Sequence, residues 1–184
     1  MRRCYVVVSI LLAAAGLASA QVPLSGNAFF GYSFYNTNLS SIDRANTNGW
    51  EGTLEGKVFP FVGIVADFSG HYGSQNFSLI CVDVPGPCGT INENITEHNL
   101  LFGPRVSGSV GKFRPFAEAM LGVGHVNVHS FATDTSFATG FGGGLDYKLV
   151  PLVAWRFQGD YIHTRFFDTH QNNLRLSTGI VIHF

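Results

Sequence analysis

The sequence predicts an all-β protein, an eight-stranded antiparallel up-and-down transmembrane β-barrel. First, apolar residues recur at every second position in eight segments, which is the period of a strand whose two faces meet different environments. Second, the connections between these segments are alternately long and short. Third, charged residues are only 12% of the chain and aromatic residues 14%, whereas a soluble domain carries about 25% charged residues.

The N-terminus has the features of an export signal. Two arginines are followed by an apolar run and by Ala18-Ser19-Ala20, the three parts of a secretory signal peptide. The alternative is a membrane anchor helix, but the run is short for a span, which takes about 20 residues. We therefore expect residues 1–20 to be a cleaved signal peptide and residues 21–184 to form one barrel domain.

Each expected strand is justified by an apolar set on one face. In the segment 50–58, for example, Trp50, Leu54 and Val58 alternate with polar and charged side chains. The apolar sets are, in chain order, Phe30/Tyr32/Phe34, Trp50/Leu54/Val58, Val62/Ile64/Ala66/Phe68, Leu100/Phe102/Val106/Val110, Ala117/Ala119/Leu121/Val123, Phe137/Phe141/Leu145/Tyr147, Trp155/Phe157/Tyr161 and Leu174/Leu176/Ile180/Ile182/Phe184. An even number of up-and-down strands can close and leave no sheet edge.

The composition of the two faces indicates which one points outward. In a soluble barrel such as a lipocalin, the apolar face would point inward and charges would cover the outside. Here the polar face is rich in Gly, Ser and Thr with few charges, and the apolar face is larger and more aromatic. A lipid-facing surface has this second character, so we expect the apolar face to meet lipid.

The connection lengths predict the orientation in the membrane. The expected connections are, in order, 36–49 (long), 59–61 (short), 74–96 (long), 111–112 (short), 129–135 (medium), 150–151 (short) and 166–172 (medium). Outer-membrane barrels have short periplasmic turns and longer extracellular loops. The pattern places both termini in the periplasm and makes loops 36–49 and 74–96 candidates for binding an extracellular ligand.

The final strand carries the most specific resemblance. Ile180, Ile182 and Phe184 alternate up to a terminal aromatic residue. The domain 21–184 resembles the small outer-membrane barrels of the OmpA-barrel, OmpX and Ail type, in which such an end is similar to the signal read by the barrel-assembly machinery. The resemblance implies a bacterial outer-membrane protein surrounded by outer-membrane lipids. We also expect a monomer without a cofactor. The peptidoglycan-binding domain of full-length OmpA is not expected.

The inward face predicts a network of charges in the lumen. Its members are Glu51, Glu55, Lys57, Asp67, Arg105, Glu118, Asp146, Lys148, Arg156, Asp160 and Arg175. The interior of an eight-stranded barrel is only wide enough to be filled by side chains, and buried charges persist when they are paired. A structural plug is therefore expected; the alternative is a narrow pore in which the same groups exchange partners.

The tight turn at Gly111-Lys112 predicts the strand register. If Val110 faces Phe113, then Arg105 lies opposite Glu118. A three-residue turn centred on Pro151 would pair Asp146 with Arg156, and a loop from Arg165 to His170 would pair Asp160 with Arg175. Glu51, Glu55 and Asp67 would then be met by Lys57, by Lys148 or across the barrel.

The sequence contains three other groups of residues that could form a site. Cys81 and Cys88 are expected to form a disulfide in an exported protein, with two free thiols as the alternative. The scattered histidines do not predict a metal site. The column Asp67-x-Ser69-x-His71 is the best catalytic candidate, although such residues commonly line barrel interiors, and we expect no enzyme activity.

The sequence leaves three functions open. We favour a structural or surface-interaction barrel whose loops contact external partners. The alternative is a small porin-like channel for water, ions or small solutes, and a lipid-modifying enzyme is third. Nothing in the balance of 11 basic against 12 acidic residues suggests a nucleic-acid partner.

Overall fold

The structure, a computed structural model, describes residues 25–38, 44–80, 87–129 and 132–184. The expected signal peptide and Cys81, one of the two cysteines of the expected disulfide, lie outside these residues. The elements are β1 (Gly26–Thr37), β2 (Ala45–Phe59), β3 (Val62–Ile80), β4 (Pro87–Ser107), β5 (Phe113–Val128), β6 (Ala132–Val150), β7 (Val153–Thr164), the 3-10 turn η1 (Phe166–Asp168) and β8 (Gln171–His183). In this part of the chain no helix is long and apolar enough to span a membrane.

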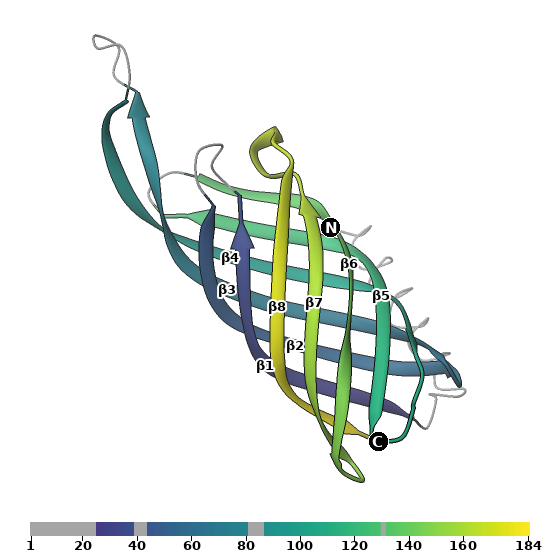
Figure 1. The fold of residues 1–184 in the computed structure, drawn as a ribbon. Helices are drawn as coiled ribbons and strands as arrows, with labels where there is room; N and C mark the ends of the chain where they lie inside the picture. The colour runs from purple at the N-terminus through teal and green to yellow at the C-terminus, as the bar shows by residue number, and fades with distance from the viewer. Residues whose placement is uncertain (1–24, 39–43, 81–86, 130–131) are drawn as a thin grey trace, which may run out of the picture.

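The eight strands close into one antiparallel barrel. Each strand pairs with the next in sequence, and β8 pairs with β1, as Figure 1 shows. This confirms the predicted fold class. Closure satisfies the backbone hydrogen bonds of both sheet edges, which an open sheet in lipid could not do.

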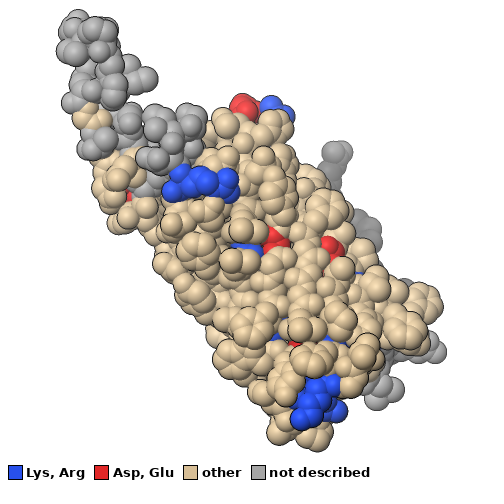
Figure 2. Space-filling model, viewed as in Figure 1, with Lys and Arg blue, Asp and Glu red and all other residues tan. Residues whose placement is uncertain are grey.

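Burial in the barrel is inverted relative to a soluble protein. Phe30, Leu54 and Phe157 are 66%, 57% and 61% exposed, whereas Glu51 and Arg175 are 0% exposed. The wall seen in Figure 2 is mainly uncharged between its two ends. Placing apolar groups outside and charges inside is stable when lipid surrounds the barrel, so the lipid-facing assignment holds and the lipocalin-like alternative does not.

The two ends of the barrel differ in their connections. One end, which we call the turn end, carries the connections Pro60-Phe61, Gly111-Lys112 and Pro151-Leu152. Gly111 has a φ of 64° there, a conformation that favours glycine. The other end, which we call the loop end, carries the remaining connections and η1.

The predicted loops 36–49 and 74–96 are wrong in extent. The β1–β2 ladder continues to Thr37 opposite Ala45, and the β3–β4 ladder continues to Ile80 opposite Pro87. The β3–β4 hairpin projects well beyond the barrel at the loop end (Figure 1). Outside the membrane, two antiparallel strands can stay hydrogen-bonded without apolar residues facing lipid. Hydrophobic alternation therefore predicted only the membrane-spanning part of each strand and missed the part that continues beyond it.

Candidate functional site

The predicted register is confirmed at all three ion pairs. Arg105 lies opposite Glu118, Asp146 opposite Arg156, and Asp160 opposite Arg175. Val110 and Phe113 form the bridge that closes the β4–β5 turn. The connection between β6 and β7 is shorter than the three residues assumed, but the ladder shifts between Lys148 and Val150. This shift restores the expected pairing of Asp146 with Arg156.

The centre of the lumen contains one guanidinium among three carboxylates. Arg175 donates to Asp67 from two nitrogens, both at 2.8 Å, and to Asp160 at 2.8 and 2.9 Å. Its Nε also lies 3.3 Å from Glu51. All four residues are at most 1% exposed. We call this group the central cluster; the acids Glu51 and Asp67 reach Arg175 across the barrel, one of the alternatives that the sequence left open.

Toward the turn end the ion pairs form a second group. Arg105 Nε donates to Glu118 at 2.6 Å, and Arg105 also reaches Glu55 at 3.3 Å. Glu55 is contacted in addition by Lys57 at 2.8 Å and by Arg114 at 3.8 Å. Three cations therefore share one carboxylate, so removal of any one of them leaves Glu55 with a partner.

Arg156 completes this second group, which we call the turn-end network. It donates to both oxygens of Asp146, at 2.6 and 2.9 Å. The Phe116 ring lies 4.5 Å from the guanidinium carbons of both Arg105 and Arg156. A desolvated cation over an aromatic face is stabilised by the ring quadrupole, so Phe116 offsets part of the cost of burying two arginines side by side.

Gln158 links the two groups. Its side-chain nitrogen donates to Glu51 at 3.0 Å, and to Glu118 and Asp160 at 2.9 Å. Beside these polar groups lies a buried apolar cluster drawn from six strands, namely Tyr35, Val65, Leu101, Met120, Ala138 and Ile162. Polar and apolar side chains therefore both point into the lumen.

Ten of the eleven predicted lumen charges are buried in these two groups. The exception is Lys148, which is exposed at the turn end and makes no ion pair within the described residues. The prediction that it joins the network is wrong, because β6 extends to Val150 and places it at the rim.

Sequence reasoning missed Arg114 and Glu97. Glu97 is 1% exposed and accepts hydrogen bonds from the Tyr35 hydroxyl at 2.9 Å and from Asn99 at 3.3 Å. Both residues lie on the inward face, but the alternating apolar sets of these two strands begin only at Leu100 and Ala117. Extending the alternation by one pleat at each strand end would have found them.

The three residues of the candidate catalytic column lie on one face of a strand, but Ser69 and His71 hydrogen-bond to different partners. Asp67, Ser69 and His71 are all buried on the inward face of β3. Ser69 accepts a hydrogen bond from Arg175 at 3.1 Å, and His71 Nε2 lies 2.8 Å from the Ser33 hydroxyl. A nucleophile needs its base within hydrogen-bond reach, and this arrangement directs Ser69 and His71 to different partners.

The histidines and acids in the described part of the barrel are not arranged as a metal site. In the four described stretches of the chain, no group of three or more His, Cys, Asp or Glu side chains is placed to hold a metal ion. His125, one of the scattered histidines, lies 2.7 Å from the Thr135 hydroxyl through its Nδ1.

Comparisons with known proteins agree with this architecture. No protein-family model matches the chain, and no curated protein matches it in sequence. The fold is similar to the crystal structure of Neisserial surface protein A, with 13% identity, a TM-score of 0.67 and coverage of 85% of this chain and 96% of that one.

Two further outer-membrane proteins share the fold. For Ail of Yersinia pestis the identity is 14%, the TM-score 0.56 and the coverage 86% and 98%. For the N-terminal β-barrel domain of Pseudomonas aeruginosa OprF the values are 13%, 0.52, 86% and 99%. The predicted likeness to small Ail- and OmpA-type barrels is thus confirmed at the level of the fold.

Proposed function

We propose that this chain is a bacterial outer-membrane barrel with a filled lumen, whose function is to contact external partners through its loop end. The exposed apolar wall supports residence in lipid, and the short turns at one end support a periplasmic turn end and an extracellular loop end. Both termini then lie in the periplasm. The last strand would present Ile180, Ile182 and Phe184 to the assembly machinery.

The projecting β3–β4 hairpin carries this proposal. β3 loses its β2 neighbour after Tyr72, and β4 has its first β5 neighbour at Ile95. Beyond those positions the two strands pair with each other up to Ile80 and Pro87. This ribbon is not needed to close the barrel, and its outer edges have unpaired backbone groups that a partner strand can use.

The charge of the hairpin indicates the kind of partner. Segment 74–96 contains no Lys or Arg, and its acids are Asp83 and Glu93. The Ail fold has been solved in complex with a heparin analogue, sucrose octasulfate, but binding of such a polyanion requires cations that this hairpin lacks. We infer that the partner is a protein surface.

Trimming the hairpin tests the proposal. Residues 75–93 are replaced by Asn-Gly, which joins the paired residues Ser74 and Asn94 through a tight turn. Cells displaying the original or trimmed barrel are compared for retention on laminin, fibronectin and heparin coats. We expect retention on a protein coat to fall with trimming and retention on heparin to be unchanged. Equal retention on every coat, with equal surface levels of the two proteins, contradicts the proposal.

A narrow pore is the second candidate function. Asp160 Oδ1, Gln158 Oε1 and Glu97 Oε2 are buried without a hydrogen-bond partner among the described residues. Buried polar atoms of this kind are commonly satisfied by water, and a file of water could carry ions. The plug is favoured because Arg105, Arg156 and Arg175 are each 0% exposed.

We propose no catalytic role. The support is the separate engagement of Ser69 by Arg175 and of His71 by Ser33. Mass spectrometry of lipid A from cells with and without the protein tests this directly, since a deacylase or acyltransferase would change the masses.

A further inference from the structure

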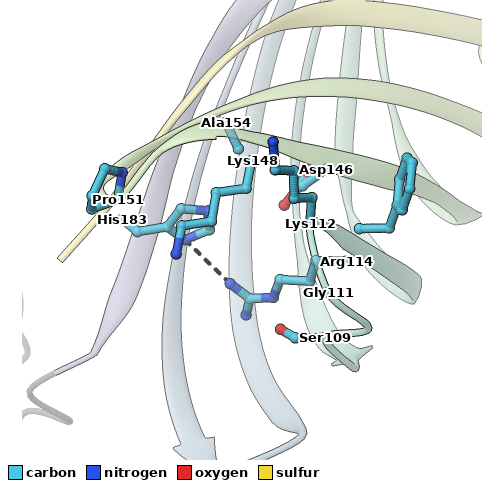
Figure 3. Close-up of a pocket in the computed structure, with 10 residues that line it drawn as sticks. Ser109, Gly111, Lys112, Arg114, Asp146, Lys148, Pro151, Ala154 and His183 are labelled. Carbon is cyan, nitrogen blue, oxygen red and sulfur yellow. Dashed lines mark hydrogen bonds between the residues drawn. The ribbon is translucent and has the colours of Figure 1, made fainter.

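A cationic pocket lies at the turn end, opposite the projecting hairpin. Its volume is about 180 Å³, and it is lined by the β4–β5 turn, β5, the end of β6 and His183 of β8 (Figure 3). One water needs about 10–15 Å³ on the same scale, so the pocket has room for a small molecular group. Figure 2 shows Lys and Arg atoms gathered at this end of the molecule.

The pocket has more positive charge than its own acids can balance. Lys112, Arg114 and Lys148 line it, and the one acid in its lining is Asp146. Both oxygens of Asp146 are already bound by Arg156, at 2.6 and 2.9 Å. Lys112 and Lys148 are exposed and form no ion pair with another described residue. Like charges held together are stabilised by an anion between them.

The lining is fixed in place by contacts that do not use the side chains of its two lysines. Arg114 donates to the Ser107 hydroxyl at 3.1 and 3.3 Å, and its NH1 lies 3.2 Å from His183 Nδ1 (Figure 3). Since a guanidinium can only donate, Nδ1 accepts and the proton of a neutral His183 ring is on Nε2. The backbone bond from Lys148 N to Lys112 O, at 2.8 Å, holds the two lysine-bearing segments together.

We propose that this pocket binds a phosphate-bearing anion. Two ammonium groups and a guanidinium supply charged donors, and the His183 imidazole supplies a neutral N–H donor, all of which phosphate oxygens can accept. The phosphate could be free in solution or belong to a phospholipid headgroup. The lipid source has support in the exposed Phe113–Tyr147 pair beside the pocket, whose ring centroids are 5.3 Å apart, because such rings favour the headgroup level of a membrane.

NMR titration of the refolded full chain tests the site. Inorganic phosphate is added at constant ionic strength against sodium chloride, and the amides of Gly111, Lys112 and Arg114 are followed. We expect shifts that saturate with phosphate and an affinity about tenfold lower in the variant Lys112→Gln/Lys148→Gln. Arg165→Gln, at the exposed loop end, is the matched control and should bind as the unmodified protein does.

Nanodiscs distinguish the two sources of phosphate. In phosphatidylcholine discs containing phosphatidylglycerol, a headgroup ligand would shift the same amides without added phosphate and block the phosphate titration. If phosphate still saturates there, the ligand is the free anion. Shifts that fail to saturate with either probe, or that are the same in the double lysine variant, overturn the proposal. Trimming of the hairpin leaves this pocket intact, so the outcome is independent of the proposed surface function.

Discussion

The central cluster and the turn-end network balance their buried charges differently: acids are in excess in the first and cations in the second. In the central cluster a single cation, Arg175, holds Glu51, Asp67 and Asp160. In the turn-end network three acids are met by four cations, in the groups Glu55/Lys57/Arg105/Arg114, Arg105/Glu118 and Asp146/Arg156. The charge balance of the central cluster therefore depends on one side chain, whereas in the turn-end network Glu55 has more than one cation to pair with. Substitutions in the two regions should differ in cost.

The largest effect is expected at Arg175. Arg175→Met leaves three buried carboxylates without a cation, and removing one partner of a buried ion pair costs about 3–5 kcal/mol. We expect the free energy of unfolding in urea, measured in one lipid, to fall by about 4 kcal/mol. Arg165→Met is the control, because that side chain is 58% exposed and should change stability by less than about 0.5 kcal/mol. Equal costs for the two variants would remove the distinction between centre and surface.

The turn-end network should respond less strongly and in a different pattern. Glu118→Ala leaves Arg105 with Glu55 as its remaining acid, so we expect a loss of about 2–3 kcal/mol. Arg105→Ala together with Glu118→Ala should cost less than Glu118→Ala alone. The double change also removes the buried guanidinium that the single change leaves without its main acid, and Glu55 keeps Lys57 and Arg114 as partners. The measurement is urea unfolding of both variants in the same lipid. A double variant as unstable as the single one would show that Arg105 contributes more than its charge pair, for instance through Phe116.

Gln158 tests whether the two regions are coupled. Gln158→Leu removes the donor shared by Glu51, Glu118 and Asp160, and the loss of hydrogen bonds to charged groups should cost about 2 kcal/mol. In a cycle with Glu118→Ala, the two costs should not be additive, since both remove the Gln158–Glu118 contact. Additive costs would mean that the two regions are energetically separate.

The smallest effect is expected at the exposed rim. Lys148→Gln should change the free energy of unfolding by less than about 0.5 kcal/mol. Lys57→Gln should cost more, about 1 kcal/mol, because the Lys57 ammonium lies 2.6 Å from the Ser107 hydroxyl and 2.8 Å from Glu55. Chemical unfolding of both variants side by side measures the difference. A cost for Lys148→Gln larger than that for Lys57→Gln would indicate that Lys148 does belong to the network.

The strand register shows what a sequence can predict for such a barrel. Alternation and one tight turn at Gly111 were enough to place Arg105 opposite Glu118, because neighbouring strands are joined by short connections that fix the ladder. The contact of Arg175 with Asp67 has no such local cause. It depends on how far the strands are staggered when the barrel closes, and on side-chain conformations across the lumen.

The limits of the strands show where sequence reasoning ends. Arg114 and Glu97 were missed at strand ends, where the lipid-facing apolar set becomes weak while the ladder continues. The β3–β4 hairpin was missed as a strand pair for the same reason. Hydrophobic alternation reports the contact of a strand with lipid, whereas the ladder itself depends on backbone hydrogen bonds, to which every residue except proline can contribute both a donor and an acceptor.

Single-channel recording in planar lipid bilayers tests most directly whether the lumen is filled. If the central cluster and the turn-end network plug the barrel, the inserted protein adds no stepwise conductance in potassium chloride. Insertion would be verified in the same preparation by the shift in gel mobility on boiling that folded barrels show. Regular conductance steps from the unmodified protein, lost when the protein is unfolded before reconstitution, would contradict the filled lumen and favour the pore.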